Sequence, residues 1–438
     1  MGGKVSTRLI TVRLIPWTLL IAITSAATIE SRPMPTNDVD RLHANFETGT
    51  LLRPSVEIPN SVDLSRAIAR LSGDGHISAG TGSEDMIAKS IGASEHIVFV
   101  VADGLGMTLL ETLPEDSFLR RNLTHELRSV FPSTTSAALT SLATGAWPSE
   151  HAVIGWWTHF TEIPGPATVL PFINRVTGAP LSEHGISAET VFPLPSRISS
   201  FDKSAVGILP VHLTRSVYSG YSLGKAIRRG YGSIAEGVDA TLTRLSDASG
   251  PTYTYLYLPQ VDSAAHTSGV GSESTRAALA EVDSGLERLA RDMPDTTKLV
   301  ITADHGHLDA FPPDPIFIRE DDELGRMLRY TPSGDARVNY YHVREDAIGR
   351  FADAYAERMP DDVVLLTQDE IESLELLGPG VIPTRTRDRM GDYIAICMSA
   401  AVFAWSAANS DGPDMSRLVS HHSGLSPDEV RIPLIIAD

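Results

Sequence analysis

The segment from Phe131 to Gly145, FPSTTSAALTSLATG, places a cluster of hydroxyl side chains in front of an alanine- and leucine-rich run. A proline followed by serines and threonines, and then by such a run, predicts a helix that begins near Ser133 or Thr134. The free N–H groups and partial positive charge of a helix N-terminus favour a bound phosphoryl group. A hydroxyl in this turn is therefore a candidate nucleophile, but it needs a base or a metal ion to activate it. Without either, the segment is simply a capped helix.

Residues able to bind metal ions stand at the ends of predicted strands and near the C-terminus. They are Asp103, Asp262, His266, Asp304, His305 and either His421 or His422. Asp262 and His266 are four residues apart, so on a helical turn they lie on one face and can hold one ion. Mixed carboxylate and imidazole ligands suit zinc, with manganese or iron as alternatives. One aspartate at a strand end is usually a cap or turn former, so the indication comes from the whole set.

Alternating strands and helices position these residues. Apolar runs predict one strand at 204–210 and three others that end at Asp103, Asp262 and Asp304. Helical patterns lie between them at 223–229, 234–245 and 274–292. This alternation predicts a doubly wound α/β sheet with helices on both faces, in which ligands bind at the carboxyl ends of the strands.

The pattern changes between residues 309 and 389, where short strands and acidic helices predict a small α+β insertion that caps the site. We therefore expect an α/β three-layer sandwich with a central, mostly parallel sheet. Its core would comprise residues 34–308 and 390–438, with the main sheet resuming at YIAICMS (393–399) and closing at IPLIIAD.

Composition narrows the classes of partner. The 438-residue chain has a formal net charge of −19 and no cluster of lysine and arginine, which argues against nucleic acid or an anionic membrane surface as a partner. The single cysteine, Cys397, excludes an internal disulfide and is expected to be buried.

Residues 1–33 have the order of a signal peptide, with basic residues, the apolar run 14–23 and then small residues. They predict export to the periplasm or the extracellular space. The alternative is an extension ahead of a start at Met34, with a cytoplasmic protein. No apolar run in the chain predicts a stable membrane span.

The ordered series VFVVADGLG, FPSTTSAALTSLATGAWPSEHAVIG, LPQVDSAAH and TADHGH, with a late H-x-G, resembles the alkaline phosphatase superfamily. Within it the chain is most similar to the type I phosphodiesterase/nucleotide pyrophosphatase family. The resemblance covers roughly residues 95–307 and the last twenty or so. It implies a hydrolase that cleaves a small-molecule phosphate ester with two divalent metal ions, Zn²⁺ first and Mn²⁺ second.

The resemblance also implies residue roles. The family's nucleophile lies ten residues before the glycine of the T-G pair, which favours Thr135 over Ser133, Thr134 and Ser136. One metal ion would then be held by Asp103, Thr135, Asp304 and His305, and the other by Asp262, His266 and a C-terminal histidine. His422 fits the H-x-G pattern better than His421 does. The implied reaction passes through a phosphothreonine.

One position departs from the family. Nucleotide-cleaving members carry an Asn that donates to a phosphate oxygen, and here Trp156, followed by Trp157, stands in its place. A diester substrate is expected first and a monoester second. A metal-binding module without catalysis and a phosphomutase are further alternatives. The sulfatase pattern C/S-x-P-x-R is missing around Thr135.

Three other histidines need an interpretation. His151 is expected to order its loop. His307 is expected either to orient a ligand or to face solvent. No substrate contact is expected for His342.

Overall fold

The main sheet brings the predicted strand ends together. The computed structural model describes residues 37–76, 80, 82–310, 315–406 and 418–438. Seven strands follow the order β2-β18-β9-β1-β8-β6-β7. Their bounds are β1 His96–Ala102, β2 Leu123–Arg128, β6 Ser204–Pro210, β7 Ile227–Tyr231, β8 Thr252–Leu258, β9 Thr297–Thr302 and β18 Arg431–Ala437. The run from β9 to β7 is parallel, whereas β18 pairs antiparallel with both β9 and β2. The expected α/β fold with a mostly parallel sheet is confirmed.

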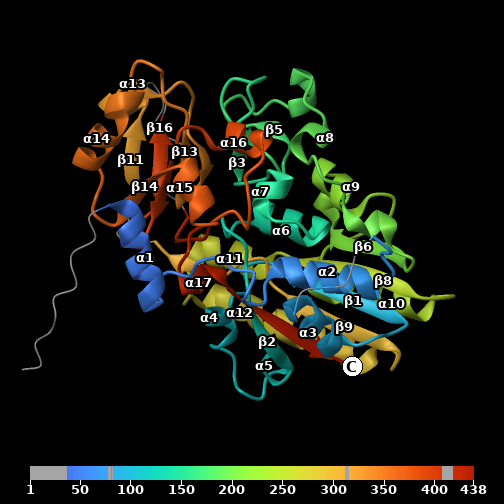
Figure 1. The fold of residues 1–438 in the computed structure, drawn as a ribbon. Coiled ribbons are helices and arrows are strands. Elements are labelled where there is room, and N and C mark those ends of the chain that lie inside the picture. The colour runs from blue at the N-terminus through green and yellow to red at the C-terminus, as the bar shows by residue number, and fades with distance from the viewer. Residues whose placement is uncertain (1–36, 77–79, 81, 311–314, 407–417) are drawn as a thin grey trace, which may run out of the picture. The chain divides into compact units, whose positions relative to one another are not determined.

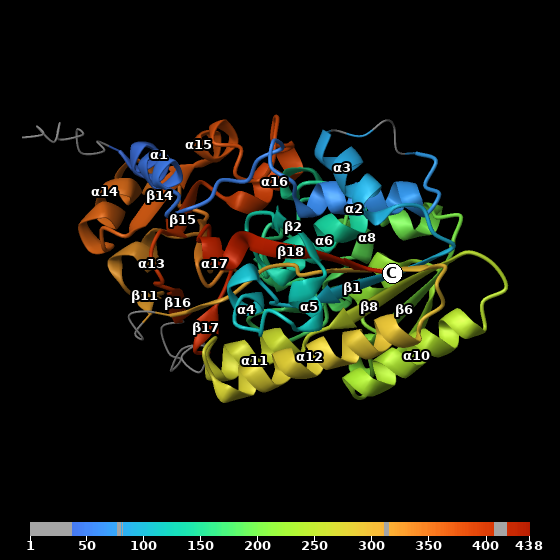
Figure 2. The same ribbon diagram turned by 90° about the horizontal axis from the view of Figure 1, so that it is seen from below.

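Helices cover both faces of this sheet, as Figure 2 shows. One face carries α2 (Ser61–Leu71), α3 (Gly82–Ile91) and α6 (Thr135–Thr144), and the other carries α10 (Ile234–Ser246) and α12 (Glu273–Asp292). Every residue of β1 is buried, because the strand is covered on both sides. Burial on both faces is the reason that the sequence of this strand is a continuous apolar run.

The helix expected over 223–229 is wrong. Helix α9 (Val217–Leu223) ends where that helix was expected to begin, and β7 follows as the edge strand of the sheet. Four of the five β7 residues are exposed. An edge strand with so little apolar burial lacks the periodic pattern from which strands are predicted.

A second, antiparallel sheet lies beside the first and appears at the upper left and centre of Figure 1. Its order is β14-β15-β13-β12-β3-β4-β5. The bounds are β3 Trp157–Thr158, β4 Ala167–Thr168, β5 Ile173–Asn174, β12 Ser333–Asp335, β13 Val338–Tyr341, β14 Val363–Thr367 and β15 Tyr393–Cys397. Helices α14 (Ile348–Arg358) and α15 (Gln368–Ser373) belong to the same part of the chain.

The expectation that the main sheet resumes at Tyr393 is wrong. Strand β15 pairs with β13 and β14 in the second sheet, where Cys397 is buried as expected. A short apolar run looks the same in either sheet, and only tertiary pairing selects its neighbours. The second sheet also draws on residues 157–174, outside the expected 309–389 segment. The division into core and inserted cap stays a prediction.

The expected signal peptide, residues 1–33, lies outside the described residues, so export stays a prediction. Within the ranges given above, none of the helices combines the length and the apolar character needed to cross a bilayer.

A buried ion pair ties the second sheet to the C-terminal segment. Arg337, between β12 and β13, donates from Nε to Glu429 Oε1 at 2.6 Å, and neither side chain is exposed. The same carboxylate oxygen accepts from the Gly424 N–H at 2.6 Å, and the Arg337 N–H donates to Ser423 Oγ at 3.2 Å. Ser423 has a φ of 100°, which is unfavourable for a residue with a side chain. The pair therefore holds a strained loop immediately after His422.

Removing the cation of this pair should be strongly destabilising. In Arg337→Met the Glu429 carboxylate stays buried without its partner, so the free energy of unfolding should fall by about 3–5 kcal/mol. Urea unfolding followed by circular dichroism measures this. Adding Glu429→Gln should recover part of the loss, because it removes the unpaired charge. If the double variant is no more stable than Arg337→Met, charge burial is not the cause.

His151 orders its loop, as expected. Its Nδ1 accepts from the Val153 N–H at 3.1 Å and its Nε2 lies 2.9 Å from Ser141 Oγ on α6, and the ring is fully buried. Burial lowers the pKa of His151 to about 3, with the positive charge of Arg389 adding to the effect.

This histidine should make stability fall in acid. Between the ordinary pKa of 6.5 and about 3 the unfolded chain binds a proton that folded His151 does not, so the free energy of unfolding falls as the pH drops through this window and is unaffected above it. The contribution reaches about 1.4 kcal/mol per pH unit. Urea unfolding from pH 7.5 to 4.5 should give a shallower pH slope in His151→Gln, but an unchanged slope in His76→Gln, since His76 is exposed. Equal slopes in all three proteins would rule this origin out.

Candidate active site

Neighbouring parallel strands bring three aspartates to one edge of the main sheet. Strand β1 lies between β9 and β8, with Val101 paired to Thr302 on one side and Ala102 to Leu258 on the other. Asp103 directly follows β1, and Asp304 comes two residues after the end of β9. Asp262 lies in the first turn of α11 (Gln260–Ser268), just beyond β8. The convergence expected from the strand ends is present.

A first cluster joins Asp103, Asp304 and His305, whose ligand atoms all lie within 4.8 Å of one another. His305 Nε2 is 3.5 Å from Asp103 Oδ1 and 3.3 Å from Asp304 Oδ2. Thr135 Oγ1 lies 3.0 Å from the same nitrogen. Of the four residues that the family resemblance assigns to one metal ion, three therefore have an oxygen within 3.5 Å of the ring nitrogen of the fourth, His305.

A second cluster forms around Asp262. His266 Nε2 lies 3.3 Å from Asp262 Oδ1 and 3.2 Å from His422 Nε2. His422 also stacks on His305, with ring centroids 3.7 Å apart. His421 belongs to none of the ligand groups; it is part of the short strand β17 (Ser420–His421), which pairs with Leu308. His421 lines the same cavity beside Thr135 as His422 does, but of the two only His422 belongs to a ligand group among the described residues.

Two residues near the clusters were missed or undervalued from sequence. His307 is buried, and its Nε2 lies 2.9 Å from Asp262 Oδ1, within a ligand group with His266. Its spacing of two from His305 was the available signal. Asp335, on β12 of the second sheet, accepts from the Thr134 hydroxyl at 2.6 Å and lines a cavity with Thr135. Nothing in the sequence pattern linked Asp335 to this edge.

The helix start selects one hydroxyl from the Ser/Thr cluster. Helix α6 begins at Thr135 with Thr134 as its N-cap residue. Ser133 Oγ donates to the Gly424 carbonyl at 2.8 Å, and the Thr134 hydroxyl is engaged by Asp335. The buried Ser136 hydroxyl has no partner in the described part of the chain. Of the four candidates, Thr135 is the one that contacts the first cluster.

The donor set fits a divalent cation. Asp103 Oδ1 and Asp304 Oδ2 are buried and receive no hydrogen bond from any described residue, although both point at His305. The other oxygen of Asp304 accepts two backbone N–H groups, and that of Asp103 accepts from the Tyr257 hydroxyl. Two unpaired carboxylate oxygens beside an imidazole nitrogen are hard oxygen and nitrogen donors of the kind that zinc takes.

The electrostatics of the clusters support the same fit. Burial raises the pKa of Asp103 well above its ordinary value, and the charges of Asp304 and Asp262 raise it further. Burial lowers the pKa of His422 well below its ordinary value, with His305 adding to the effect, so its imidazole stays neutral and keeps a lone pair. Burial alone would raise the pKa of Asp262, but hydrogen bonds from His266 and His307 lower it well below normal.

Two tryptophans border the space around Thr135. Trp156 lines both cavities that reach Thr135, and Trp157 lines one of them. The Arg175 guanidinium lies 3.5 Å from the centroid of the Trp157 ring and fixes it in place. His342 packs instead against His159, with ring centroids 4.0 Å apart, and lines neither cavity.

Because the aspartates repel one another, we expect replacing Asp103 to stabilise the protein without metal and to reduce its stabilisation by metal. Without metal, Asp103→Asn should raise the melting temperature at neutral pH, because an amide needs neither a buried charge nor a bound proton next to Asp304 and Asp262. With Zn²⁺ at about 100 times Kd, the wild type should gain about 2.7 kcal/mol, and the variant clearly less. Differential scanning fluorimetry with EDTA or zinc measures both. A variant that is less stable in EDTA and gains as much from zinc would contradict the cation site.

Comparisons with known proteins identify the family and the fold of the chain. The sequence model of the type I phosphodiesterase/nucleotide pyrophosphatase family matches residues 97–423. No curated protein sequence matches the chain. Similar solved structures include murine ectonucleotide pyrophosphatase/phosphodiesterase 5, with a TM-score of 0.55, 17% identity, and 77% of this chain and 87% of that chain covered.

An inactive threonine-to-alanine variant of the murine protein, in complex with AMP, is similar at a TM-score of 0.55 and 16% identity over 77% of this chain and 87% of that chain. Phosphonoacetate hydrolase from Sinorhizobium meliloti, in complex with phosphonoformate, has a TM-score of 0.53 and 17% identity, with 77% and 89% covered. These identities show a shared fold. Since the family match spans most of the sequence, the chain belongs to the type I phosphodiesterase/nucleotide pyrophosphatase family of the alkaline phosphatase superfamily, and it is a hydrolase of phosphoric esters.

Proposed function

We propose that the chain hydrolyses a phosphodiester through attack by Thr135. The observation that carries the proposal is the position of the Thr135 hydroxyl, 3.0 Å from His305 Nε2 at the first residue of α6 and beside the buried carboxylates of the first cluster. A phosphoryl group at this point would meet the free N–H groups of the helix start. The family's action on small phosphate esters supports the substrate class.

The metal ions would be divided between the two clusters. Asp103, Thr135, Asp304 and His305 would hold one, and Asp262, His266 and His422 the other, with Zn²⁺ as the first choice and Mn²⁺ as the second. When bound, two such ions favour the ionised forms of a hydroxyl and of a water, and offset charge on phosphoryl oxygens. His307 would orient Asp262 through its 2.9 Å contact.

The protein's own groups would carry the reaction in two displacements. Thr135 Oγ1 forms a bond to phosphorus and gives up its proton, while the bond from phosphorus to the ester oxygen breaks and the alcohol leaves with a proton. A water then forms a bond to phosphorus, the bond to Thr135 Oγ1 breaks, and the threonine regains its proton. The first turn of α6 keeps the phosphoryl group in place throughout.

A monoesterase is the second candidate. Trp156, which takes the place of the family's phosphate-binding Asn, lines both cavities beside Thr135 and offers them a large ring. The replaced Asn is a feature of the family's nucleotide-cleaving diesterases, so the presence of Trp156 weakens the case for a diester relative to a monoester. The comparison of mono- and diester substrates decides between the two.

The test compares hydrolysis of 4-nitrophenyl phosphate and bis(4-nitrophenyl) phosphate with zinc, with manganese and with EDTA. We expect metal-dependent turnover, faster with the diester, that falls by about three orders of magnitude in Thr135→Ala. Ser136→Ala is the matched control, since it removes the adjacent buried hydroxyl and should leave the rate within a few-fold. Turnover that survives in Thr135→Ala would exclude the nucleophile, and bound metal without any turnover would favour a binding module.

A further inference from the structure

A largely apolar cavity opens directly beside Thr135. Its volume is about 400 Å³, within the range of ligand pockets in proteins. Asp103, Thr135 and Asp262 are among the residues that line it. The rest of its wall contains His212 and three serines but is mainly aliphatic and aromatic, with Leu139, Leu170, Leu213, Tyr218, Tyr255 and Tyr257. A group attached to a phosphorus at Thr135 would therefore enter an apolar space.

The cavity offers no permanent cation for a second anionic group. Neither lysine nor arginine occurs among the described residues that line it; its titratable acidic and imidazole residues are Asp103, Asp262 and the exposed His212. The neighbouring cavity at Thr135 likewise has no lysine or arginine in its described lining. Beyond the two metal clusters, a further phosphate would meet no lysine or arginine of the described lining, and burying its charge in a mainly apolar space is unfavourable.

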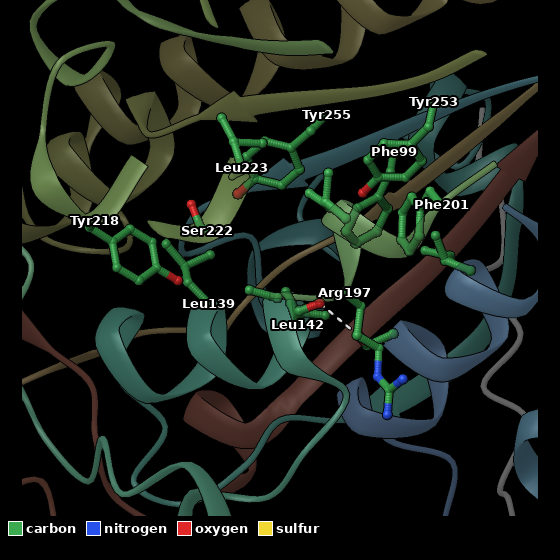
Figure 3. A pocket seen from close by; sticks show the side chains of 14 residues that line it. Phe99, Leu139, Leu142, Arg197, Phe201, Tyr218, Ser222, Leu223, Tyr253 and Tyr255 are labelled. Atoms are coloured by element: carbon green, nitrogen blue, oxygen red, sulfur yellow. Dashed lines mark hydrogen bonds between the residues drawn. The ribbon is translucent and has the colours of Figure 1, made fainter. Parts of the chain in front are cut away.

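The apolar surface continues past the cavity. A smaller space, shown in Figure 3, shares Leu139, Tyr218, Ser222 and Tyr255 with it and adds apolar residues such as Phe99 and Phe201. Its volume of about 30 Å³ has room for roughly one small group.

Arg197, which lines this smaller space, does not supply a free charge. It donates to the Thr144 carbonyl at 2.8 Å and to the Asp74 carboxylate at 3.1 Å. The small space therefore extends the apolar cavity without adding a counter-charge for an anion.

We propose that this cavity binds an uncharged, apolar alkyl or aryl group of the substrate. The substrate class is then a phosphate ester whose only charge is on the reacting phosphoryl group, in place of a nucleoside di- or triphosphate. This inference rests on the proposed function, because it places the phosphorus at Thr135. Burying each methylene group contributes about 0.8 kcal/mol, or roughly a fourfold gain in affinity.

The test measures binding by isothermal titration calorimetry to the zinc-loaded protein, with methyl-, butyl- and octylphosphonate and with ADP. We expect Kd to fall about fourfold per methylene group from methyl- to butylphosphonate and ADP to bind more weakly than butylphosphonate. A Kd independent of chain length, or ADP binding more tightly than butylphosphonate, would overturn the proposal. Because calorimetry measures binding without turnover, a negative result here is distinguishable from a failure to hydrolyse nitrophenyl esters.

Variants of the cavity wall test whether the alkyl chain of the phosphonate binds in this cavity. Ser222→Leu adds bulk where the two spaces meet and should weaken octylphosphonate at least tenfold while changing methylphosphonate less than twofold. Ser246→Leu, on the exposed side of α10, is the matched control and should change neither. Leu213→Ala, which removes wall without adding bulk, should weaken butylphosphonate several-fold if Ser222→Leu does not fold. Equal affinities for the long phosphonates in both wall variants and the wild type would place the alkyl group elsewhere.

Discussion

The parallel pairing of β1 with β9 on one side and β8 on the other is the constraint on which the site depends. It brings Asp103, Asp304 and the start of α11 to the same edge of the sheet. This arrangement also concentrates carboxylates in a buried place, which is unfavourable and raises the pKa of Asp103. Such an arrangement is stable only if something positive, a proton or a metal ion, joins it. The strand order of the sheet therefore creates a cluster of carboxylates that favours a bound cation.

The other half of the site depends on contacts over long sequence distances. His422 reaches Asp262 from a loop near the C-terminus, and Ser133 and Arg337 both bind that loop. Arg337 belongs to the second sheet and Ser133 to the turn before α6. The loop is therefore held from two sides, which positions the histidine precisely although its own backbone is strained at Ser423.

Charge and apolar surface are separated around Thr135. The carboxylates and imidazoles of the two clusters gather beside its hydroxyl, and Leu139, one helical turn later on the same face of α6, belongs to the aliphatic and aromatic wall. A single helix thus presents the candidate nucleophile and part of the substrate wall. This division explains how a strongly acidic chain can accept an anionic ester: the cations would neutralise the phosphoryl group, while the attached group contributes hydrophobic contact.

Much of this could be predicted from sequence, because parallel strands buried on both faces are continuous apolar runs and their following residues are local in the chain. Asp103, Asp262, Asp304 and His305 were identified in this way, and the hydroxyl cluster marked the start of α6. The residue roles remain proposals.

Tertiary structure alone decided which sheet Tyr393–Cys397 joins, that Asp335 reaches Thr134, and that His307 contacts Asp262. It also decided the wall of the apolar cavity, whose residues come from α6, the loop at Leu170, α9 and β8. Sequence patterns report each residue's own burial and periodicity, whereas these contacts depend on how distant segments pack, and packing is a property of the whole fold.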